Sequence, residues 1–570
     1  MARSWQARPL AGNPEELSLA LGIAPVLARH LCLRGVGDAA VAGKFLAPRL
    51  ADMLDPRQMA GMDAAVERVA RAVANKESVG LCGDYDVDGV TSTTLLTEVL
   101  RAFGINPVLY IPHRIRDGYG LNHEAVKTFA ARGTKLLITL DCGVTAVEEV
   151  QAAVDAGMDV IVIDHHTVPV TLPPAVAVLN PHRTDCAFAY KQLCAVGVTF
   201  YLCVALRTAL RAAGLAGPNG GPDLKEYLDL VALGTVADLV PLTGQNRILV
   251  AAGLRTMAGA RRVGLRALMD ISKVNAAGVT AGDLAFQLGP RINAAGRLQD
   301  AMVGVQLLLE DDPARAAQLA AVLDQENQNR KDTEKRTVED ALRMAQLEPH
   351  LSARALVLYS EDWHPGVVGI AAQKMVEQFH KPSILVGAGG KGSGRSIEAF
   401  HLHRALAETS AHLLGFGGHA HAAGLRVDPQ KLDAFRLALY AHAQAMLTPE
   451  DLTPRTHHDG VLPLDALAQS TLDALAPAAP FGRANAEPCF LVPGATLREA
   501  RVVGKTQEHV SLWFGGSQRG IAFRMAPHLD AMRAQPCDFL ITPKEESYQG
   551  VRRVSLHVRD WRPAAAQGAA

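Results

Sequence analysis

Three aspartates at alternate positions are the first residues of this sequence whose types and spacing could do chemistry. Asp84, Asp86 and Asp88 stand in the stretch GDYDVDGVTST, with no basic residue between them. Carboxylates this close repel one another unless positive charge lies between them, and a divalent cation would supply that charge. The first interpretation of the stretch is therefore a metal site.

A calcium-binding loop is the alternative interpretation of the same stretch. Such a loop carries a glutamate at its twelfth position. Leu95 stands there instead, a β-rich run leads straight into the aspartates, and a helical pattern follows them. We therefore favour aspartates at the end of a buried strand over a calcium loop.

Two later motifs supply further carboxylate and imidazole groups. LLITLDCGV delivers Asp141, and VIVIDHH delivers the run from Asp164 to His166; Asp238 follows another apolar run in VALGTVADLVPL. Oxygen ligands with one or two imidazoles suit Mn²⁺ or Mg²⁺, and the surplus of carboxylates suggests two ions. Asp-His-His alone could equally be a capped turn, but the motifs together favour a metal centre.

The elements that must position these motifs are short apolar strands. Continuous apolar strands that alternate with helical patterns indicate an α/β fold, with a parallel sheet covered on both faces. In such sheets ligands bind beyond the carboxyl ends of the strands. The expected strands are SVGLCG (78–83), PVLYIP (107–112), KLLITL (135–140), DVIVI (159–163) and AVAVLN (175–180).

The rest of the chain divides into further parts. A long helix is expected to begin with Asp312 as N-cap and Pro313 at its first position. Residues 324–337 lack large apolar side chains, so the middle of this helix should bridge two domains through solvent. Residues 449–460 resemble a linker. The expected parts are an N-terminal extension (1–50), a first α/β domain (51–310), the connecting helix (311–350), a second α/β domain (351–448), a small barrel or sandwich (460–562) and a disordered tail (563–570).

Composition limits the classes of protein that remain. The 570 residues carry a net charge of −1, so any nucleic-acid binding must come from local basic patches. Eight scattered cysteines without a CxxC pair indicate a reducing compartment, and Cys82 and Cys142 are expected as small buried residues. The N-terminus lacks the apolar run of a signal peptide, and no apolar stretch approaches the roughly 18 residues of a membrane helix. We expect a soluble, cytoplasmic protein.

An ordered set of motifs over roughly residues 45–565 resembles the DHH phosphoesterases, and within them the branch of bacterial single-strand-specific 5′→3′ exonucleases. The resemblance implies a DHH catalytic domain, a DHHA1-type domain that clamps substrate, and a C-terminal oligonucleotide-binding (OB-like) barrel. Besides the aspartate and histidine motifs it rests on GYGLN (118–122), LGTVADLVPL (233–242), NRILV (246–250), GPRINAAGRL (289–298), WHPGVVGI (363–370), GSGRS (392–396) and GFGGHAHAAG (415–424).

The resemblance also implies roles for the motif residues. Asp141 would bridge two Mn²⁺ or Mg²⁺ ions, His166 would face the substrate phosphate, and Asp164 would orient the histidines. Many family members begin the first motif with histidine, whereas this chain has Asp84, as the exonuclease branch does. The implied metal-binding set is Asp84, Asp86, Asp88, Asp141, His165 and Asp238, and the implied catalytic group is Asp141, Asp164, His165 and His166.

Candidates for substrate binding lie in the remaining motifs. A 5′ phosphate would be bound by arginines and a hydroxyl, the histidines of GFGGHAHAAG, His419 and His421, could touch the strand, and Tyr119 could stack a base. Arg291 and Asn293 could be structural or belong to the site. The phosphate candidates are Arg114, Arg297, Ser393 and Arg395, and the aromatic candidates of the barrel are Trp513, Phe514, Phe523, Trp561 and, as the best exposed, Tyr548.

The implied activity is two-metal hydrolysis of single-stranded DNA from its 5′ end to 5′ mononucleotides, in DNA repair and recombination. A single-strand-binding protein and a helicase are the implied partners of a monomer that does not bind membranes. One rival is a DHH hydrolase of short oligonucleotides, cyclic dinucleotides or pyrophosphate. The other is a non-catalytic DNA-binding scaffold, although such proteins tend to lose the metal ligands that this chain retains.

Overall fold

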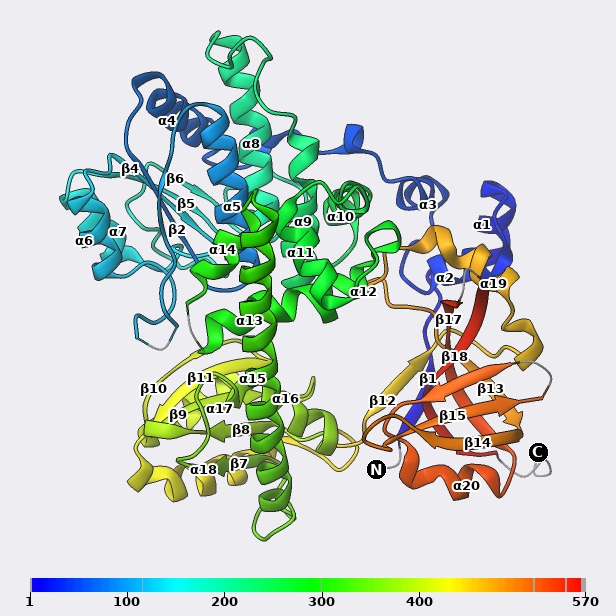
Figure 1. Ribbon diagram of the computed structural model, residues 1–570. Coiled ribbons are helices and arrows are strands. Elements are labelled where there is room, and N and C mark those ends of the chain that lie inside the picture. The colour runs from blue at the N-terminus through cyan, green and yellow to red at the C-terminus, as the bar shows by residue number, and fades with distance from the viewer. Residues whose placement is uncertain (1–2, 115, 299, 516–517, 549–550, 565–570) are drawn as a thin grey trace. The chain divides into compact units, whose positions relative to one another are not determined.

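The computed structural model describes residues 3–114, 116–298, 300–515, 518–548 and 551–564, and these form two compact units (Figure 1). The first unit comprises Asp52–Val240 and Ile248–Pro454. The second comprises Arg3–Ala51, Pro241–Arg247 and the chain from Arg455 onward. All of the candidate site residues named above, except the barrel aromatics, lie in the first unit.

A five-stranded parallel sheet carries the aspartate and histidine motifs. It contains the five strands that the sequence predicts, in the order β3-β2-β4-β5-β6. Because all five are parallel, their carboxyl ends lie along one edge of the sheet, where the motifs begin. The bounds are β2 Val79–Gly83, β3 Val108–Tyr110, β4 Leu136–Leu140, β5 Asp159–Ile163 and β6 Ala177–Leu179.

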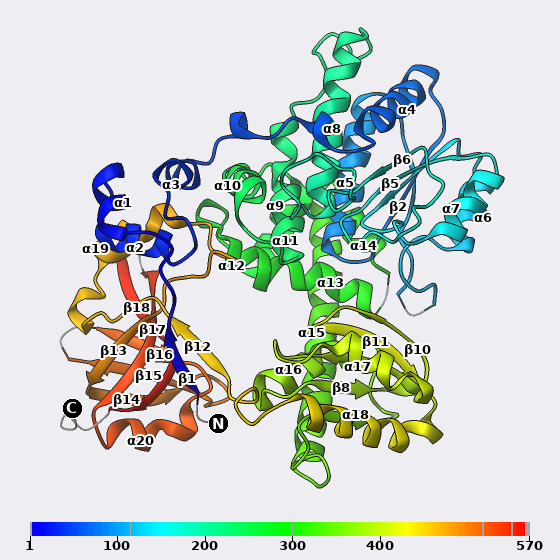
Figure 2. The same ribbon diagram turned by 180° about the vertical axis from the view of Figure 1, so that it is seen from behind.

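Helices cover both faces of this sheet (Figures 1 and 2). Side chains of α6 (His123–Ala131) and α7 (Val147–Asp155) share an apolar cluster with β2, β4 and β5 on one face. The other face carries α5 (Val87–Ala102) and α8 (Ala195–Ala212). The strands read as continuous apolar runs because both faces are buried. Further helices are α4 Met62–Asn75, α9 Leu228–Ala237, α10 Gly244–Ala258, α11 Val263–Ser272, α12 Ala281–Asp283, α13 Gly289–Leu298 and α14 Met302–Leu308.

The long connecting helix is α15, Pro313–Ala345. Asp312 is its N-cap, with the carboxylate accepting a hydrogen bond from the Arg315 backbone N–H at 2.7 Å, as predicted. The prediction that its polar middle crosses solvent holds in part, because α15 runs from α13 to α16 and half of residues 324–337 are exposed, but Glu326 and Asn327 are buried. This part of the helix packs against α13 and holds its polar side chains in contacts with one another; Arg330 donates to Asn327 at 2.9 Å.

A second sheet follows α15, with strand order β10-β11-β9-β8-β7. Strands β7 and β8 pair in parallel and the other pairs are antiparallel. One face packs on α16 (Val368–Phe379) and the end of α15, and the other on α17 (Leu402–Glu408) and α18 (Leu432–Met446). The strand bounds are β7 Leu356–Tyr359, β8 Ser383–Val386, β9 Lys391–Arg395, β10 Leu413–Gly418 and β11 Ala422–Val427.

The second unit contains a six-stranded sheet in the order β13-β17-β18-β16-β15-β14. Phe514 is fully buried in its core, which excludes it from base stacking, whereas Trp513 is partly exposed and Phe523 is 48% exposed. The side chain of Tyr548 and residues 565–570 of the predicted tail lie outside the described residues. The bounds are β13 Phe490–Ala495, β14 Leu497–Val503, β15 His509–Phe514, β16 Arg519–Ala522, β17 Cys537–Tyr548 and β18 Val551–Pro563, with the short helices α19 Gln469–Leu475 and α20 Leu529–Arg533.

The N-terminal residues fold within this second unit. Strand β1 (Ser4–Ala7) pairs in parallel with β12 (Arg455–His458), so part of the segment predicted as a linker is a strand. The polar, short sequence RTHH gives no strand signal of its own. Arg34 also donates two hydrogen bonds to the carboxylate of Asp459, at 2.9 and 2.8 Å. The helices of this region are α1 Pro14–Leu21, α2 Pro25–Cys32 and α3 Ala39–Leu46.

One helix of the described residues is long and apolar enough to cross a membrane by length and composition alone. It is α8, whose 18-residue window has a mean hydropathy of 1.4, so the expectation that no such stretch exists is corrected. Of that window, 67% is buried inside the protein, which is what a core helix on one face of a sheet requires.

Candidate metal centre and phosphate-binding site

The first motif folds over the end of β2 into the start of α5. Asp86 is the N-cap of α5, where its carboxylate accepts hydrogen bonds from the backbone N–H groups of Asp88 (2.9 Å) and Gly89 (3.2 Å). Asp88 is buried, and its two oxygens accept from the backbone N–H groups of Ala195 (2.6 Å) and Val196 (2.8 Å) at the start of α8. The carboxylates are thus held by backbone groups of two helix starts.

Asp141 follows β4 in a conformation that side chains rarely adopt. Its φ is +65°, and its backbone N–H donates to the carbonyl of Ile163 at 2.9 Å. Such a backbone costs on the order of 1–3 kcal/mol and persists where the surroundings determine it, often at functional sites. One carboxylate oxygen of Asp141 lies 3.2 Å from Nε2 of His165.

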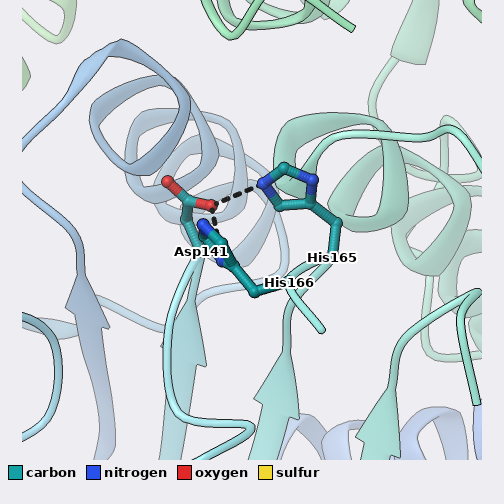
Figure 3. Close-up of side chains that lie close together, drawn as sticks. All are labelled: Asp141, His165 and His166. Carbon is teal, nitrogen blue, oxygen red and sulfur yellow. Dashed lines mark ion pairs between the residues drawn. The ribbon is translucent and has the colours of Figure 1, made fainter. Parts of the chain in front are cut away.

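Asp164 holds the two histidines that follow it. One oxygen accepts from the backbone N–H groups of His165 (2.7 Å) and His166 (3.1 Å) and contacts Nδ1 of the His166 ring at 2.8 Å. The other oxygen accepts from the Val144 N–H at 3.0 Å. Figure 3 shows the rings of His165 and His166 turned toward the carboxylate of Asp141. These contacts support an orienting role for Asp164.

All six residues predicted to bind metal lie in one cluster. Three groups of side chains each place one ligand atom per residue within 4.8 Å of the others, and the groups share Asp141 and His165. His166, expected to face substrate, also belongs to one of them. The groups are Asp84–Asp86–Asp141, Asp141–His165–His166 and Asp88–His165–Asp238.

These residues fit a divalent cation. Within the described residues, the buried atoms Oδ1 of Asp84, Oδ1 of Asp141 and Nε2 of His165 have no hydrogen-bond partner. A buried polar atom without a partner is costly, and a metal ion would satisfy all three. Hard oxygen ligands with an imidazole match the preferences of Mn²⁺ and Mg²⁺.

The pKa values of the carboxyls in the cluster are raised, as expected for buried acidic groups without a positive charge between them. Burial first, and the neighbouring Asp86 second, raise the pKa of Asp88 to about 7. The same two causes, in the same order, raise the pKa of Asp84 and of Asp141 well above the ordinary range. For His166 burial acts to lower the pKa, but Asp164 outweighs it and raises the pKa to about 9. In the absence of a cation, this shift favours the protonated imidazole of His166.

Basic side chains gather on the β3 side of the cluster. The guanidinium of Arg114 stacks on the ring of Tyr85 at 4.8 Å, and both line a cavity of about 330 Å³ with Arg297, Asp84 and Asp238. Burial, and then the proximity of other arginines, lower the pKa of Arg297 to about 10. Guanidinium groups crowded in this way favour an anionic ligand.

Ser393 and Arg395 face the same region from β9. Arg395 donates to the hydroxyl of Ser393 (3.0 Å) and to the carbonyl of Gly394 (2.8 Å). A second, smaller cavity of about 140 Å³ is lined by Arg114, Lys391 and the first residue of α16, Val368, among others. A helix N-terminus beside arginines adds to the attraction for an anion.

Sequence reasoning missed several residues of this region. Tyr85 was not a candidate although it lies between two of the aspartates, and Lys391 lies just outside the motif GSGRS. Arg330 on α15 acts on the pKa of Arg297 and was overlooked because its helix was expected in solvent. The only available signal for Tyr85 was its place inside the aspartate motif.

Of the remaining candidate residues, some line the site and others have structural contacts. Tyr119 donates its hydroxyl to the carbonyl of Asp141 at 2.9 Å, so it belongs to the site. His419 lines a cavity beside the histidines, whereas Asn293 accepts from the Val87 N–H at 3.1 Å and holds the start of α5. Arg291 is structural, because it pairs with Asp324 at 2.8 Å. Cys82 and Cys142 are buried, as predicted.

Family models match three parts of the chain. The DHH family N-terminal domain matches residues 78–235, the DHHA1 domain matches residues 352–444, and the RecJ OB domain matches residues 458–560. The first match covers the parallel sheet and the metal cluster except Asp238, the second the sheet that carries Ser393 and Arg395, and the third most of the six-stranded sheet of the second unit. The fold is the α/β arrangement with a C-terminal OB domain that the sequence predicts.

Known proteins resemble the chain over nearly its whole length. The single-stranded-DNA-specific exonuclease RecJ of Dickeya dadantii is 42% identical over 88% of this chain and 89% of its own. The crystal structure of RecJ from Thermus thermophilus in complex with Mn²⁺ has a TM-score of 0.84 at 31% identity, covering 99% of this chain and 80% of that one. The Mg²⁺ complex of the same protein gives 0.78 at 29% identity, covering 99% and 78%. With this identity and coverage, and with the three domains in the same order, the chain belongs to the RecJ family.

Proposed function

We propose that this chain is a metal-dependent exonuclease specific for single-stranded DNA, which removes 5′ mononucleotides one at a time. Family membership supports the enzyme class. The claim that cleavage starts at the 5′ end is supported by the position of the metal cluster beside a group of arginines on the β3 side. If the arginines bind the terminal phosphate, the phosphodiester that reaches the metal cluster is the first one from the 5′ end. The enzyme would then cleave only from that end.

Each part of the site has a distinct task. Divalent cations held by the cluster would supply a nucleophilic water near neutral pH and neutralise charge on the phosphodiester. His166, held by Asp164 through Nδ1, has Nε2 left to donate to a phosphate oxygen or to the leaving 3′ oxygen. Arg114, Arg297 and Arg395 would bind the 5′ phosphate, and Tyr119 beside Tyr85 would position the terminal nucleotide.

One assay tests this function directly. Single-stranded DNA labelled at its 5′ or at its 3′ end should release 5′-labelled mononucleotide first, only with Mn²⁺ or Mg²⁺, and duplex DNA should resist. Release of 3′ label first would contradict the polarity. Consumption of dinucleotides but not of long strands would favour a hydrolase of short substrates, and absence of turnover with metal bound would favour a scaffold.

The family resemblance also suggests a cellular role and partners for this protein. A role in DNA repair and recombination, a cytoplasmic location, and a single-strand-binding protein and a helicase as partners follow from the family resemblance. A helicase fits the chemistry, because an enzyme that degrades single strands needs a supply of unwound ends.

Adding Mn²⁺ or Mg²⁺ should raise the melting temperature of the protein, and more so at pH 8 than at pH 6. The buried carboxyls have folded-state pKa values above their ordinary value of 3.8, with Asp88 at about 7. Without metal, the folded state retains protons that the unfolded chain releases, so the contribution of these carboxyls to stability is full below about pH 4 and is lost as the pH rises through about 7. A cation replaces those protons and removes the loss.

Thermal unfolding in chelator and in metal, at both pH values, measures this effect. Equal increases at pH 6 and pH 8 would contradict the raised pKa values. A metal-induced increase that also occurs after Asp155→Asn, a change of an exposed carboxylate on α7, would show that the increase does not depend on surface charge.

Trp513 on the OB domain should contribute to DNA binding. Its ring lies between the guanidinium groups of Arg501 (4.9 Å) and Arg519 (5.5 Å), which is a surface suited to bases and phosphates. Trp513→Ala should weaken binding of a long single strand by roughly tenfold without changing the salt dependence, since stacking involves no counterion release. Arg519→Ala should reduce the salt slope by about one unit.

Full-length protein in chelator, titrated with labelled DNA at several salt concentrations, measures both effects. Truncation after residue 450 is a poor alternative, because it removes the strand that pairs with β1 and the partner of Arg34. If Trp513→Ala changed the salt slope and Arg519→Ala did not, the assigned roles would be wrong.

A further inference from the structure

A small cavity of about 140 Å³ adjoins the cavity that holds the metal cluster. Among the described residues, the charged side chains that line it are both cationic, Arg114 and Lys391. Arg114 also lines the larger cavity together with Arg297, which donates to the carbonyl of Gly366 at 3.2 Å, and Gly366 lines the small cavity. The two cavities are therefore neighbours with arginines between them. We call the small one the Lys391 cavity.

Strand β9 presents a row of polar side chains to helix α16, which lies beside it (Figure 1). A Cβ added to Gly369 of α16 would meet the Ser393 hydroxyl and the Arg395 guanidinium, so both side chains face this helix. Lys391 is two residues before Ser393 and lies on the same face of the strand, roughly 7 Å further along. Arg395 is partly buried and Lys391 is exposed, so the row leads from the proposed 5′-phosphate site outward to solvent.

The beginning of α16 adds backbone donors to the same cavity. Val368, the first residue of this twelve-residue helix, lines the cavity. The N-cap residue is Val367, which makes no side-chain hydrogen bond to the first turn. Backbone N–H groups of a first turn without a side-chain cap attract an anion. With Arg114 on one side and Lys391 on the other, the cavity suits negative charge rather than a base or a sugar.

We propose that the Lys391 cavity binds the additional phosphates of a strand whose 5′ end carries a diphosphate or a triphosphate. This inference rests on the proposed 5′→3′ function and adds a class of substrate to it. The first phosphate occupies the arginine site, and the second and third extend past Arg114 to Lys391 and the beginning of α16. Each additional phosphate brings negative charge to cationic groups that a single phosphate at the arginine site does not reach.

The terminal nucleotide then leaves as a nucleoside 5′-diphosphate or 5′-triphosphate. Water adds to the phosphorus of the first internal phosphodiester, the bond from that phosphorus to the 3′ oxygen of the terminal nucleotide breaks, and this oxygen takes up a proton. The bonds between the terminal phosphates stay intact, because these phosphates lie in the Lys391 cavity and not at the metal cluster. Polymerisation that starts a strand from a nucleoside triphosphate is the class of reaction that supplies such ends.

A single DNA sequence with different 5′ ends tests the proposal. The full-length protein, with Mn²⁺ in excess over all phosphates, is given the strand with a 5′ monophosphate or a 5′ triphosphate. We expect kcat/KM on the triphosphorylated strand to be at least as high as on the monophosphorylated one, and mass spectrometry to identify an intact nucleoside triphosphate as the first product. Resistance of the triphosphorylated strand would overturn the proposal. Release of pyrophosphate would also overturn it, because the terminal phosphates would then lie at the metal cluster.

Variants of Lys391 test the cavity itself. Lys391→Met removes the charge and keeps much of the side chain, so the ratio of kcat/KM on triphosphorylated to monophosphorylated DNA should fall roughly tenfold, the effect of one charge-assisted hydrogen bond. Lys391→Arg keeps the charge and should keep the ratio. Lys335→Met, at an exposed lysine of α15 that lines neither cavity, is the matched control and should also keep it. An unchanged ratio in Lys391→Met would show that the additional phosphates lie elsewhere.

Failure of the underlying function looks different from failure of this inference. If the proposed function is wrong, the monophosphorylated strand shows no metal-dependent release from its 5′ end. Release from the 5′ end of the monophosphorylated strand, together with resistance of the triphosphorylated strand, would reject the Lys391 cavity alone.

Discussion

Replacing Asp141 with asparagine should abolish hydrolysis of single-stranded DNA, lowering kcat by at least about a thousandfold. Asp141 belongs to two of the three groups of potential metal ligands, so one substitution disturbs the whole cluster. The charge stabilisation that metals supply is worth several kcal/mol, and each 1.36 kcal/mol is tenfold in rate. Asparagine tolerates the φ of +65° at this position, so the backbone should keep its shape.

The same substitution should stabilise the metal-free protein. Asparagine in place of Asp141 removes a buried carboxyl whose own pKa is raised by burial and by the neighbouring Asp86, Asp88 and Asp84, so the melting temperature in chelator at pH 8 should rise. The increase on adding Mn²⁺ should shrink at the same time. Asp155→Asn is the matched control, and DNA binding should survive in both variants. An Asp141→Asn protein that turns over normally would remove this residue from the metal centre.

The metal cluster could be predicted because its geometry follows from local rules. Strands that read as continuous apolar runs pair in parallel, and parallel strands end on one edge, so Asp84, Asp141 and His165 had to come close. The strained backbone at Asp141 was not predictable from the strand pattern, and its N–H donates to the carbonyl of Ile163 on a neighbouring strand. The family resemblance implied that Asp164 orients the histidines, and its four contacts in the structure support that role.

The contacts between distant segments could not be predicted. Residues Arg3–Ala51 fold with the C-terminal sheet through the pairing of β1 and β12, which are more than 440 residues apart and polar in sequence. The buried polar residues of α15 were missed for a related reason. A polar face usually indicates solvent, but Glu326 and Asn327 are buried, and no pattern within a helix reveals the polar partners that make this possible.

Arg395→Ala should remove the preference of the enzyme for a 5′-phosphorylated end. One terminal nitrogen of Arg395 donates hydrogen bonds to the Ser393 hydroxyl and the Gly394 carbonyl, and these bonds fix the guanidinium. Its other nitrogens are then placed to bind a ligand. Gly369 of α16 lies so close that an added Cβ would meet the Ser393 hydroxyl at 2.9 Å and the guanidinium at 3.3 Å. A charge-assisted hydrogen bond is worth about 1.5–3 kcal/mol, so the preference should fall by roughly ten- to a hundredfold.

The loss should be confined to phosphorylated ends. Rates on 5′-hydroxyl DNA should change little, because the proposed partner of Arg395 is absent from that substrate and the metal cluster is untouched. Arg404→Ala, which removes an exposed arginine of α17 on the same domain, should leave both rates unchanged and so excludes a general effect of charge. If the cleavage rate fell equally on 5′-phosphorylated and 5′-hydroxyl DNA, Arg395 would contact the body of the DNA strand rather than its terminal phosphate. The terminal phosphate would then have to be bound by Arg114 and Arg297, the arginines that line the cavity with Asp84.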